Sequence, residues 1–382
     1  MPKVTHPSTH PPLPPTTEDE RVSWLRLLRS RRVGPATFHR LLRDHGSIAA
    51  ALDALPEVAR AAGVPDYTPC PDGVAIAELR AARTAGARML TCLDPEFPHD
   101  LRDLPDCPPL LWVMGDTAVL SRPMIALVGA RNASSLGLRM AKSLAAELAQ
   151  KGFAVVSGLA RGIDTAAHLA SLEAGTIAVM AGGVDVIYPA ENARLSRDIL
   201  RSGLRLSEQP MGLVPQARHF PSRNRLVSGL ARAVVVVEAA AKSGSLITAR
   251  TALDQGREVM AVPGHPFDAR AAGCNMLLRD GATLVRNAAD VIEALPLEDA
   301  PAQAPVQASI PLPDPVPPPR PLRESAALHA EILARLGPSP LAEDQLIRDL
   351  ASPAQAVTPA LVALELDGRI TRHPGGLVSL AV

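Results

Sequence analysis

Between residues 124 and 262 the chain alternates short runs of consecutive apolar residues with longer amphipathic segments. The runs lie at 124–128, 153–156, 176–180 and 204–207 and in the VVVVEA segment, and the first three are followed by predicted helices at 138–151, 165–174 and 190–202. Strands that are apolar on both faces are typical of a parallel sheet covered by helices on both sides. The pattern therefore predicts a doubly wound α/β domain, which we place at residues 86–297.

The segment before this domain has a helical pattern. Residues 20–85 hold short amphipathic helices, with Gly34-Pro35 in a turn, Gly46 as a stop, and separate helices at 48–55 and 58–62. Its arginines could contact phosphates at the helix–turn–helix or form only a solvated basic face: Arg26, Arg29, Arg31, Arg32, Arg40 and Arg43. The proline-rich residues 1–19 are predicted to be a disordered tail.

The C-terminal segment predicts a second small domain. Residues 298–323 are rich in proline and read as a semi-rigid linker, and residues 324–382 follow with three helices and a hairpin at 370–378. The third helix is expected to begin at Pro359 with Thr358 as its N-cap. This order is typical of a winged helix, but the segment PALVALELD has no lysine or arginine. A protein-interaction or regulatory role is therefore favoured over a DNA contact.

Charge and cysteine content restrict the function. The 39 Lys and Arg residues balance the 39 Asp and Glu residues, so any anion site must be local. Four cysteines lack metal-binding spacing, which favours free thiols in a reducing compartment and no metal. The chain shows no leader and no apolar run long enough for a membrane span. A soluble, cytoplasmic protein is the expectation.

Polar and glycine-rich turns follow the predicted strands at one edge of the sheet. In such sheets, ligands bind beyond the carboxyl ends of the strands, where glycine and helix N-termini expose backbone N–H groups. The turns contain Gly129, Arg131, Ser134, Ser135 and Gly137 after the first strand, Ser157, Gly158, Arg161, Gly162 and Asp164 after the second, and Lys242, Ser243, Gly244, Ser245 and Thr248 after VVVVEA.

A further helix is expected to open at Pro221. It would carry Arg223, Asn224 and Arg225 in its first turn, where a cation opposes the helix dipole unless an anion is bound. Two simpler interpretations stay open: either arginine could pair with Glu208 or Glu238, and Asp164 could only cap its helix. Taken together, the turns predict a phosphate-binding pocket.

Catalytic motifs are missing from these turns. The first turn reads GARNASSLG, which is neither a dinucleotide fingerprint nor a P-loop, and Ser157 does not lie in a nucleophile elbow. His168 has no evident nucleophilic partner and is interpreted as a packed histidine. We therefore expect a binding surface, not an enzyme, with no cofactor.

Six blocks in this order resemble the DNA-processing protein A family, also called Smf. They are ALVGARNASSLG, VVSGLARGIDTAAH, GGVDVIYPAEN, FPSRNRLVSGLA, VVVVEAAAKSGSLITARTALDQGREVMAVPG and GCNMLLRDGA. The resemblance implies an extended Rossmann-like core, a SAM or helix-hairpin-helix-like domain before it and a winged helix after it. It also implies a homodimer that binds and protects single-stranded DNA and helps to load the RecA recombinase in natural transformation.

The same resemblance implies a set of phosphate contacts. They are Gly129, Arg131, Ser157, Gly158, Arg161, Arg223, Asn224, Arg225, Lys242, Ser243, Gly244 and Ser245. Phe220, Phe267 and Tyr188 could stack on bases, although core packing is the favoured use of each ring. The rival function is an enzyme acting on nucleoside monophosphates in the same pocket, but the PGGxGTxxE element of such hydrolases is absent.

Overall fold

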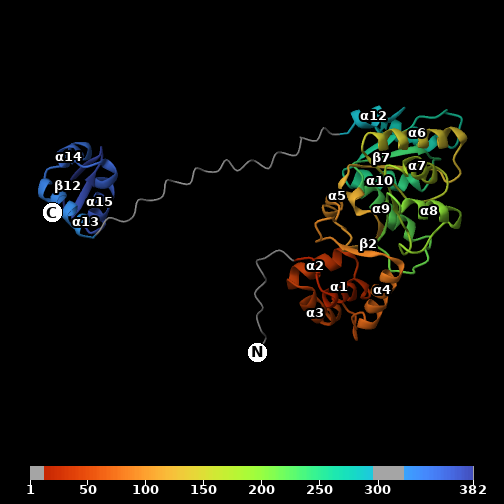
Figure 1. Cartoon of the computed structure of the whole chain (residues 1–382), viewed down its shortest axis with the longest axis horizontal. Helices are drawn as coiled ribbons and strands as arrows, with labels where there is room; N and C mark the ends of the chain where they lie inside the picture. Colours follow the sequence, from red (N-terminus) through yellow and green to blue (C-terminus); the bar gives the residue numbers. More distant parts are fainter. Residues whose placement is uncertain (1–12, 296–321, 382) are drawn as a thin grey trace. The chain divides into compact units, whose positions relative to one another are not determined.

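The computed structural model describes residues 13–295 and 322–381, which belong to two compact units divided after Pro296 (Figure 1). Residues 1–12 of the predicted tail and nearly all of the predicted linker lie outside the described residues. Within the described ranges, no helix is both long and apolar enough to cross a membrane.

The N-terminal helices form the first layer of the larger unit. They are α1 (Glu18–Arg29), α2 (Pro35–His45), α3 (Ile48–Ala61) and α4 (Asp72–Ala85). α1 begins two residues before the predicted start, because Thr17 and Glu20 form a capping box. α3 is one helix where two were predicted, since the buried face of Leu52, Leu55 and Ala59 continues past Pro56.

A nine-stranded sheet follows, in the order β1-β2-β6-β5-β4-β3-β7-β8-β9. The strands from β3 to β9 pair in parallel, whereas β1 and β2 are antiparallel additions at one edge. Their bounds are β1 (Arg88–Thr91), β2 (Leu110–Gly115), β3 (Met124–Gly129), β4 (Ala154–Ser157), β5 (Thr176–Val179), β6 (Leu204–Ser207), β7 (Ala233–Glu238), β8 (Glu258–Ala261) and β9 (Thr283–Leu284).

Helices cover both faces of this sheet, as the apolar runs predict. Ile125 and Leu127 of β3 pack on one side with α6 (Ser135–Gln150), α7 (Ile163–Ser171) and α12 (Ala288–Glu293). Ala126 and Val128 pack on the other side, in a core shared with the N-terminal helices. That second side holds α9 (His219–Leu230), α10 (Ser245–Asp254) and α11 (Ala272–Arg279).

Short elements complete the larger unit. α5 (His99–Arg102) lies between β1 and β2, and the 3-10 turns η1 (Thr117–Ser121) and η2 (Ala190–Asn192) precede β3 and α8 (Ala193–Ile199). α8 packs through Leu195 and Ile199 on a separate small apolar cluster.

The smaller unit is a winged helix. It contains α13 (Leu322–Arg335), β10 (Leu341–Ala342), α14 (Glu343–Leu350), α15 (Ala354–Leu366), β11 (Ile370–His373) and β12 (Leu377–Leu380), with strand order β10-β12-β11. The prediction of Thr358 as an N-cap was wrong. α15 begins at Ala354 after Pro353, because Val357 is fully buried and holds the preceding turn in the core.

Candidate anion-binding site

A cavity of about 940 Å³ opens beyond the carboxyl ends of β3, β4 and β7. β3 pairs with β4 on one side and with β7 on the other, so the chain reverses its direction of travel across the sheet at this point. At such a switch point the loops that follow the two neighbouring strands run to opposite sides of the sheet, which leaves a crevice beyond the strand ends. The cavity therefore occupies the position where doubly wound sheets bind ligands.

Nine of the twelve predicted contact residues line this cavity. They come from the turns after β3, β4 and β7 and from α9, which shows that the fold brings these distant segments together. They are Gly129, Arg131, Gly158, Arg223, Asn224, Lys242, Ser243, Gly244 and Ser245. Arg161 lines an adjoining cavity of about 200 Å³ that shares Arg131 and Gly158.

The N-terminus of α10 faces the cavity without a side-chain cap. Its N-cap is Gly244, which has no side chain to cap the helix, and the first N–H of α10, that of Ser245, donates to Ser243 Oγ over a long 3.4 Å. The cavity is lined there by Lys242, Ser243 and Ser245, and the two serine Oγ atoms lie 2.7 Å apart. A helix N-terminus carries partial positive charge, so this end of α10 is suited to an anion.

At the N-terminus of the neighbouring helix α6, the backbone N–H groups find acceptors within the protein itself. The carboxylate of Glu238 accepts hydrogen bonds from the Ser134 backbone N–H at 2.9 Å and from its hydroxyl, and the Ser134 hydroxyl accepts one from Gly137. The Asp164 carboxylate similarly accepts from the backbone N–H groups of Gly158 and Ala160, in the turn before α7. Internal carboxylates thus occupy these two turns, whereas among the described residues the first N–H groups of α10 bond to neutral oxygens of Ser243 and Gly244 and to no carboxylate.

Arg223 places a buried positive charge at the wall of the cavity. Its Nη1 donates to the carbonyl oxygens of Gly158 at 2.6 Å and Val179 at 2.5 Å, and its Nε donates to Asn224 Oδ1 at 3.3 Å. Burial lowers the pKa of Arg223 to about 10, which still leaves it charged at neutral pH. Burial also raises the pKa of Asp164, an effect that the Arg223 charge opposes.

Arg131 and Lys242 are exposed cations of the same cavity. Among the residues that the structure describes, neither forms an ion pair with a carboxylate. The Arg131 guanidinium carbon lies 5.1 Å from the centre of the Phe220 ring, and the Tyr188 ring centre lies 5.7 Å from that of Phe220. A cation and two rings therefore form one rim of the cavity.

The expectation that the three rings serve core packing was wrong. Phe220 is half-buried at the cavity, Tyr188 is 49% exposed and Phe267 is 95% exposed. The Phe267 ring centre lies 5.6 Å from that of His265, and Phe267 is not among the residues that line the cavity. The rings that do pack in the core are others, among them Trp24, Phe38, Phe97 and Trp112.

Three of the predicted contacts do not line the main cavity. Ser157 is fully buried, and its hydroxyl donates to Leu127 O at 2.7 Å, which removes it from the cavity. Arg225 contacts the carboxylates of Glu208 and Asp106, 3.3 Å from the latter, as one of the two simpler interpretations expected. Arg161 is exposed and pairs with Glu191.

The start of α9 also differs from the prediction. α9 begins at His219 and not at Pro221, so Arg223 and Arg225 lie beyond its first turn. The argument from helix dipole and cation therefore does not apply to them. Instead, Arg223 is held by backbone carbonyls and points to the cavity, whereas Arg225 is turned toward Glu208.

His168 is a packed histidine, as predicted. Its ring is fully buried and its Nδ1 lies 2.8 Å from the Thr176 hydroxyl, which itself donates to Val155 O. Because that hydroxyl has only one hydrogen, Nδ1 must carry the proton of the hydrogen bond to Thr176. Burial lowers the pKa of His168 to about 3, so the ring is neutral.

Some residues of the site were not identified from the sequence. Asn132, next to Arg131, and Arg270, in the segment after β8, both line the cavity. Applying the strand-end rule to β8 would have found Arg270, which makes an ion pair with Asp268 at 3.2 Å. In the N-terminal helices, two arginines proposed as phosphate contacts are paired internally, Arg26 with Asp72 and Arg29 with Glu78.

Fold and cavity together define a class: a Rossmann-like protein with a cation-lined cavity at its switch point, preceded in the sequence by a helical segment and followed by a winged helix. Family models extend this. Residues 18–81 match the DprA-like N-terminal HHH domain, residues 88–296 match DNA recombination-mediator protein A, and residues 316–376 match the DprA winged helix domain. The chain belongs to the DprA/Smf family.

Individual relatives agree with this assignment. The chain is 43% identical over 221 residues to the DNA processing protein DprA of Bacillus subtilis, covering 57% of this chain and 74% of the relative. It is 39% identical over 297 residues to Protein Smf of Escherichia coli, covering 75% and 76%.

Two solved structures are similar in fold. The X-ray structure of DNA processing protein A from Streptococcus pneumoniae matches with a TM-score of 0.57 at 33% identity, over 72% of this chain and 93% of that one. The Helicobacter pylori protein, whose structure is described as giving insight into a unique single-stranded DNA binding mode, matches with a TM-score of 0.51 at 32% identity, over 55% and 96%.

Proposed function

We propose that this protein binds single-stranded DNA without sequence preference and holds successive phosphates in the cavity beside α10. The observation that carries the proposal is that Arg131, Arg223 and Lys242 line the same cavity as the N-terminus of α10. Phosphate contacts from cations and backbone N–H groups bind any sequence, because the phosphate is the same in every nucleotide.

The aromatic rim suits a single strand better than a duplex. Phe220 and Tyr188 lie beside the cations and are accessible, so an unpaired base next to a bound phosphate could stack on either ring. Bases in a duplex are already stacked and present only their edges. Stacking on exposed rings combined with a cationic groove is the usual arrangement of sequence-tolerant single-strand binders.

Similarity to the relatives extends the proposal to a cellular role. The matched relatives are DNA processing proteins, and one solved relative is described as binding single-stranded DNA. We infer that this protein works in the cytoplasm, protects incoming DNA in natural transformation or another recombination task, and helps to load RecA.

The RecA proposal can be tested by recombinase assembly. RecA-driven strand exchange should be faster when this protein is added to DNA already covered by single-strand-binding protein. Equal rates with and without it would contradict the loading role while leaving DNA binding intact.

We favour binding over catalysis in this cavity. The one carboxylate among its described lining residues is Asp164, which is buried and held by two backbone N–H groups. A hydrolase acting on nucleoside monophosphates would need a general base or a metal-binding carboxylate free to act. Release of base or phosphate from a nucleoside monophosphate would instead support the rival function.

Salt dependence of DNA binding gives the direct test. Fluorescence anisotropy with a labelled single strand and its duplex, at several salt concentrations, should show preference for the single strand and a steep loss of affinity with salt. Arg131→Ala should weaken binding to all sequences alike, by roughly tenfold at low salt. Arg194→Ala is the matched control, since Arg194 is an exposed arginine of α8 that does not line the cavity. Salt-independent binding, or an Arg131→Ala protein that binds normally, would refute the proposal.

Dimerisation is proposed from exposed apolar side chains. Leu253 of α10, Met276 of α11 and Leu284 of β9 are 58%, 38% and 47% exposed, and β9 is an edge strand of the sheet. Apolar surface near an open sheet edge favours association with a second copy. Light scattering should give twice the chain mass, and Leu284→Glu should reduce it to a monomer.

The winged helix is proposed to bind protein. α15 has no lysine or arginine, and Arg372 of the hairpin is paired with Glu343 and Glu365 at 3.3 and 3.2 Å. Val362 and Leu366 of α15 are 43% and 83% exposed. Removing the winged helix should therefore leave single-strand affinity unchanged and alter only reactions that contain partner proteins.

A further inference from the structure

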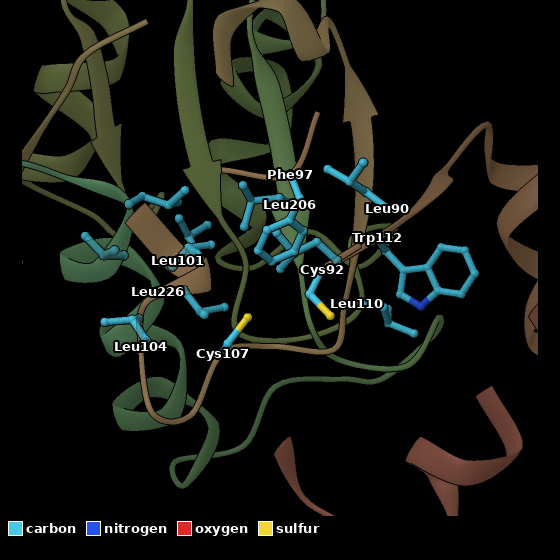
Figure 2. Packing of buried hydrophobic residues seen from close by; sticks show 14 of the residues in the cluster. Leu90, Cys92, Phe97, Leu101, Leu104, Cys107, Leu110, Trp112, Leu206 and Leu226 are labelled. Carbon is cyan, nitrogen blue, oxygen red and sulfur yellow. The ribbon is translucent and has the colours of Figure 1, made fainter. Parts of the chain in front are cut away.

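His39, Cys92 and Cys107 converge at a second place, and none of the three is among the residues that line the cavity described above. His39 belongs to α2, Cys92 directly follows β1, and Cys107 lies three residues before β2. Their potential donor atoms, one ring nitrogen and two sulfurs, all lie within 4.8 Å of one another. Figure 2 shows both cysteine side chains within a packed group of apolar residues that includes Phe97, Leu101 and Leu226.

The backbone holds the three residues in place. The Cys92 N–H donates to Pro109 O at 3.1 Å, which extends the β1–β2 pairing by one step toward Cys107. His39 Nε2 lies 2.9 Å from the carbonyl oxygen of Cys107. Because a carbonyl only accepts hydrogen bonds, Nε2 carries the proton, and a neutral His39 ring keeps its lone pair on Nδ1.

The donor set determines which ligand would fit. Two thiolates and an imidazole are the soft and borderline donors that Zn²⁺ and Cu⁺ prefer, whereas Mg²⁺ and Ca²⁺ require oxygen. Cys92 and Cys107 are 6% and 5% exposed. Two thiolates would neutralise the charge of Zn²⁺, which reduces the cost of burying the ion.

The distances are compatible with one ion. A Zn–S bond of about 2.3 Å puts the two sulfurs of a tetrahedral or trigonal site about 4 Å apart. The observed upper limit of 4.8 Å between donors therefore requires closure by less than about 1 Å. Side-chain rotation can supply a movement of this size without moving β1 or β2.

We propose that His39, Cys92 and Cys107 form a binding site for a thiophilic d10 cation, Zn²⁺ or Cu⁺, that joins α2 to the β1–β2 edge of the sheet. His39 and Cys92 are 53 positions apart in the sequence, and Cys92 and Cys107 are 15 apart. Because each residue comes from a different segment, they form no short metal-binding motif in the sequence.

The site also has a connection to the cavity. Asp106, the residue before Cys107, pairs with Arg225 at 3.3 Å, and its carbonyl oxygen accepts from Arg225 Nη1 at 2.9 Å. Arg225 belongs to α9, the helix that carries Arg223 to the cavity. An ion that fixes Cys107 would therefore also fix the segment on which α9 rests.

Metal titration of the reduced, chelator-treated full chain tests the proposal. Competition with a chromophoric chelator should show one equivalent of Zn²⁺ or, under anaerobic conditions, of Cu⁺. Cys92→Ser, Cys107→Ser and His39→Gln should each weaken binding at least tenfold. Cys274→Ser, which alters a buried free cysteine elsewhere, is the matched control and should bind normally. At a hundredfold excess of Zn²⁺ over Kd, the midpoint of thermal unfolding should rise by roughly 5 °C.

A second measurement keeps the proposal falsifiable if a variant folds poorly. Co²⁺ added to the wild-type chain should give a thiolate-to-cobalt charge-transfer band, which Cys274→Ser retains. No uptake of Zn²⁺, Cu⁺ or Co²⁺ by the folded wild-type chain would overturn the site. Uptake unchanged in folded Cys92→Ser and Cys107→Ser would also overturn it. A third contrary result would be a reduced chain that binds no metal and that, after peroxide treatment, loses the mass of two hydrogens because Cys92 and Cys107 form a disulfide.

Discussion

The guanidinium of Arg223 lies directly against the α-carbon of Gly158. A Cβ atom at position 158 would be 2.2 Å from Arg223 Nη1 and 2.4 Å from Cζ, far inside van der Waals contact. Glycine is therefore required at this turn because a buried cation occupies the space of a side chain. The same contact places the Gly158 carbonyl where Arg223 can donate to it.

Gly158→Ala should destabilise the protein. The methyl group would displace Arg223 and break its hydrogen bonds to Gly158 and Val179, which should lower the free energy of unfolding by roughly 2–4 kcal/mol. Urea unfolding measures this change. A Gly158→Ala protein with wild-type stability and wild-type DNA affinity would show that the Arg223 contact has no role.

Gly244→Ala provides the contrasting substitution. The Cβ position of Gly244 has no atom within 4 Å, and its φ of −63° suits alanine, so stability should be unchanged. The methyl group would occupy space in front of the α10 N-terminus, and single-strand affinity should fall roughly tenfold, equivalent to about 1.4 kcal/mol. Unchanged affinity in an anisotropy titration would exclude an anion at that helix end.

Phe220→Leu and Lys242→Ala should weaken DNA binding in different ways. Loss of a stacking ring should cost about 1–3 kcal/mol of binding free energy without changing the salt dependence. The binding constant falls with salt, so a plot of log K against log salt has a negative slope. Loss of a phosphate-binding lysine should make this slope shallower by about 1. Phe267→Leu is the matched control for the ring, since Phe267 lies outside the cavity. Equal effects of the two phenylalanine substitutions would contradict the assignment of Phe220 to the site.

Arg225→Met should reduce stability and not DNA affinity. It would leave Glu208 without its ion pair at a site where the side chains of Arg225 and Glu208 are only 14% and 15% exposed. Burial already raises the pKa of Glu208. The expected loss is about 2–3 kcal/mol of unfolding free energy, and adding Glu208→Gln should recover part of it. A folded Arg225→Met protein that binds DNA tenfold more weakly would restore Arg225 as a phosphate contact.

His168 should make the protein sensitive to mild acid. Its pKa is about 3 in the folded protein and about 6.5 when unfolded, so below pH 6.5 the unfolded state binds a proton that the folded state excludes. Stability is complete above pH 6.5 and falls as the pH drops toward 3. Between pH 7.5 and 5 the loss from this residue should be about 2 kcal/mol.

His168→Asn isolates that contribution. Asparagine can still donate to Thr176 but does not titrate, so the variant should lose about 2 kcal/mol less than the wild type over this pH range. Urea unfolding at both pH values measures the difference. Parallel losses in the two proteins would mean that His168 is protonated in the folded state.

The apolar pattern predicted the central fold well. Runs such as those at β3 and β7 have no polar alternation, and this property follows directly from burial on both faces. Helix ends were predicted less well. Thr358 was predicted as an N-cap, but the burial of Val357 places it inside α15, which begins at Ala354. Pro221 was predicted as the start of α9, but that helix begins two residues earlier, at His219.

Which turns meet at the site could be predicted from the sequence, because the carboxyl ends of parallel strands lie at one edge of a sheet and Gly129, Gly158 and Gly244 lie at or after such ends. Which polar side chains face the cavity could not be predicted in this way, because it depends on the packing of the folded chain. Arg223 and Arg225 are two positions apart on one helix, yet one reaches the cavity and the other reaches Glu208. Likewise, the carboxylate of Glu238 lies at the N-terminus of α6, whereas the neutral hydroxyl of Ser243 lies at that of α10. Such choices depend on partners brought from distant parts of the chain, and no local pattern encodes them.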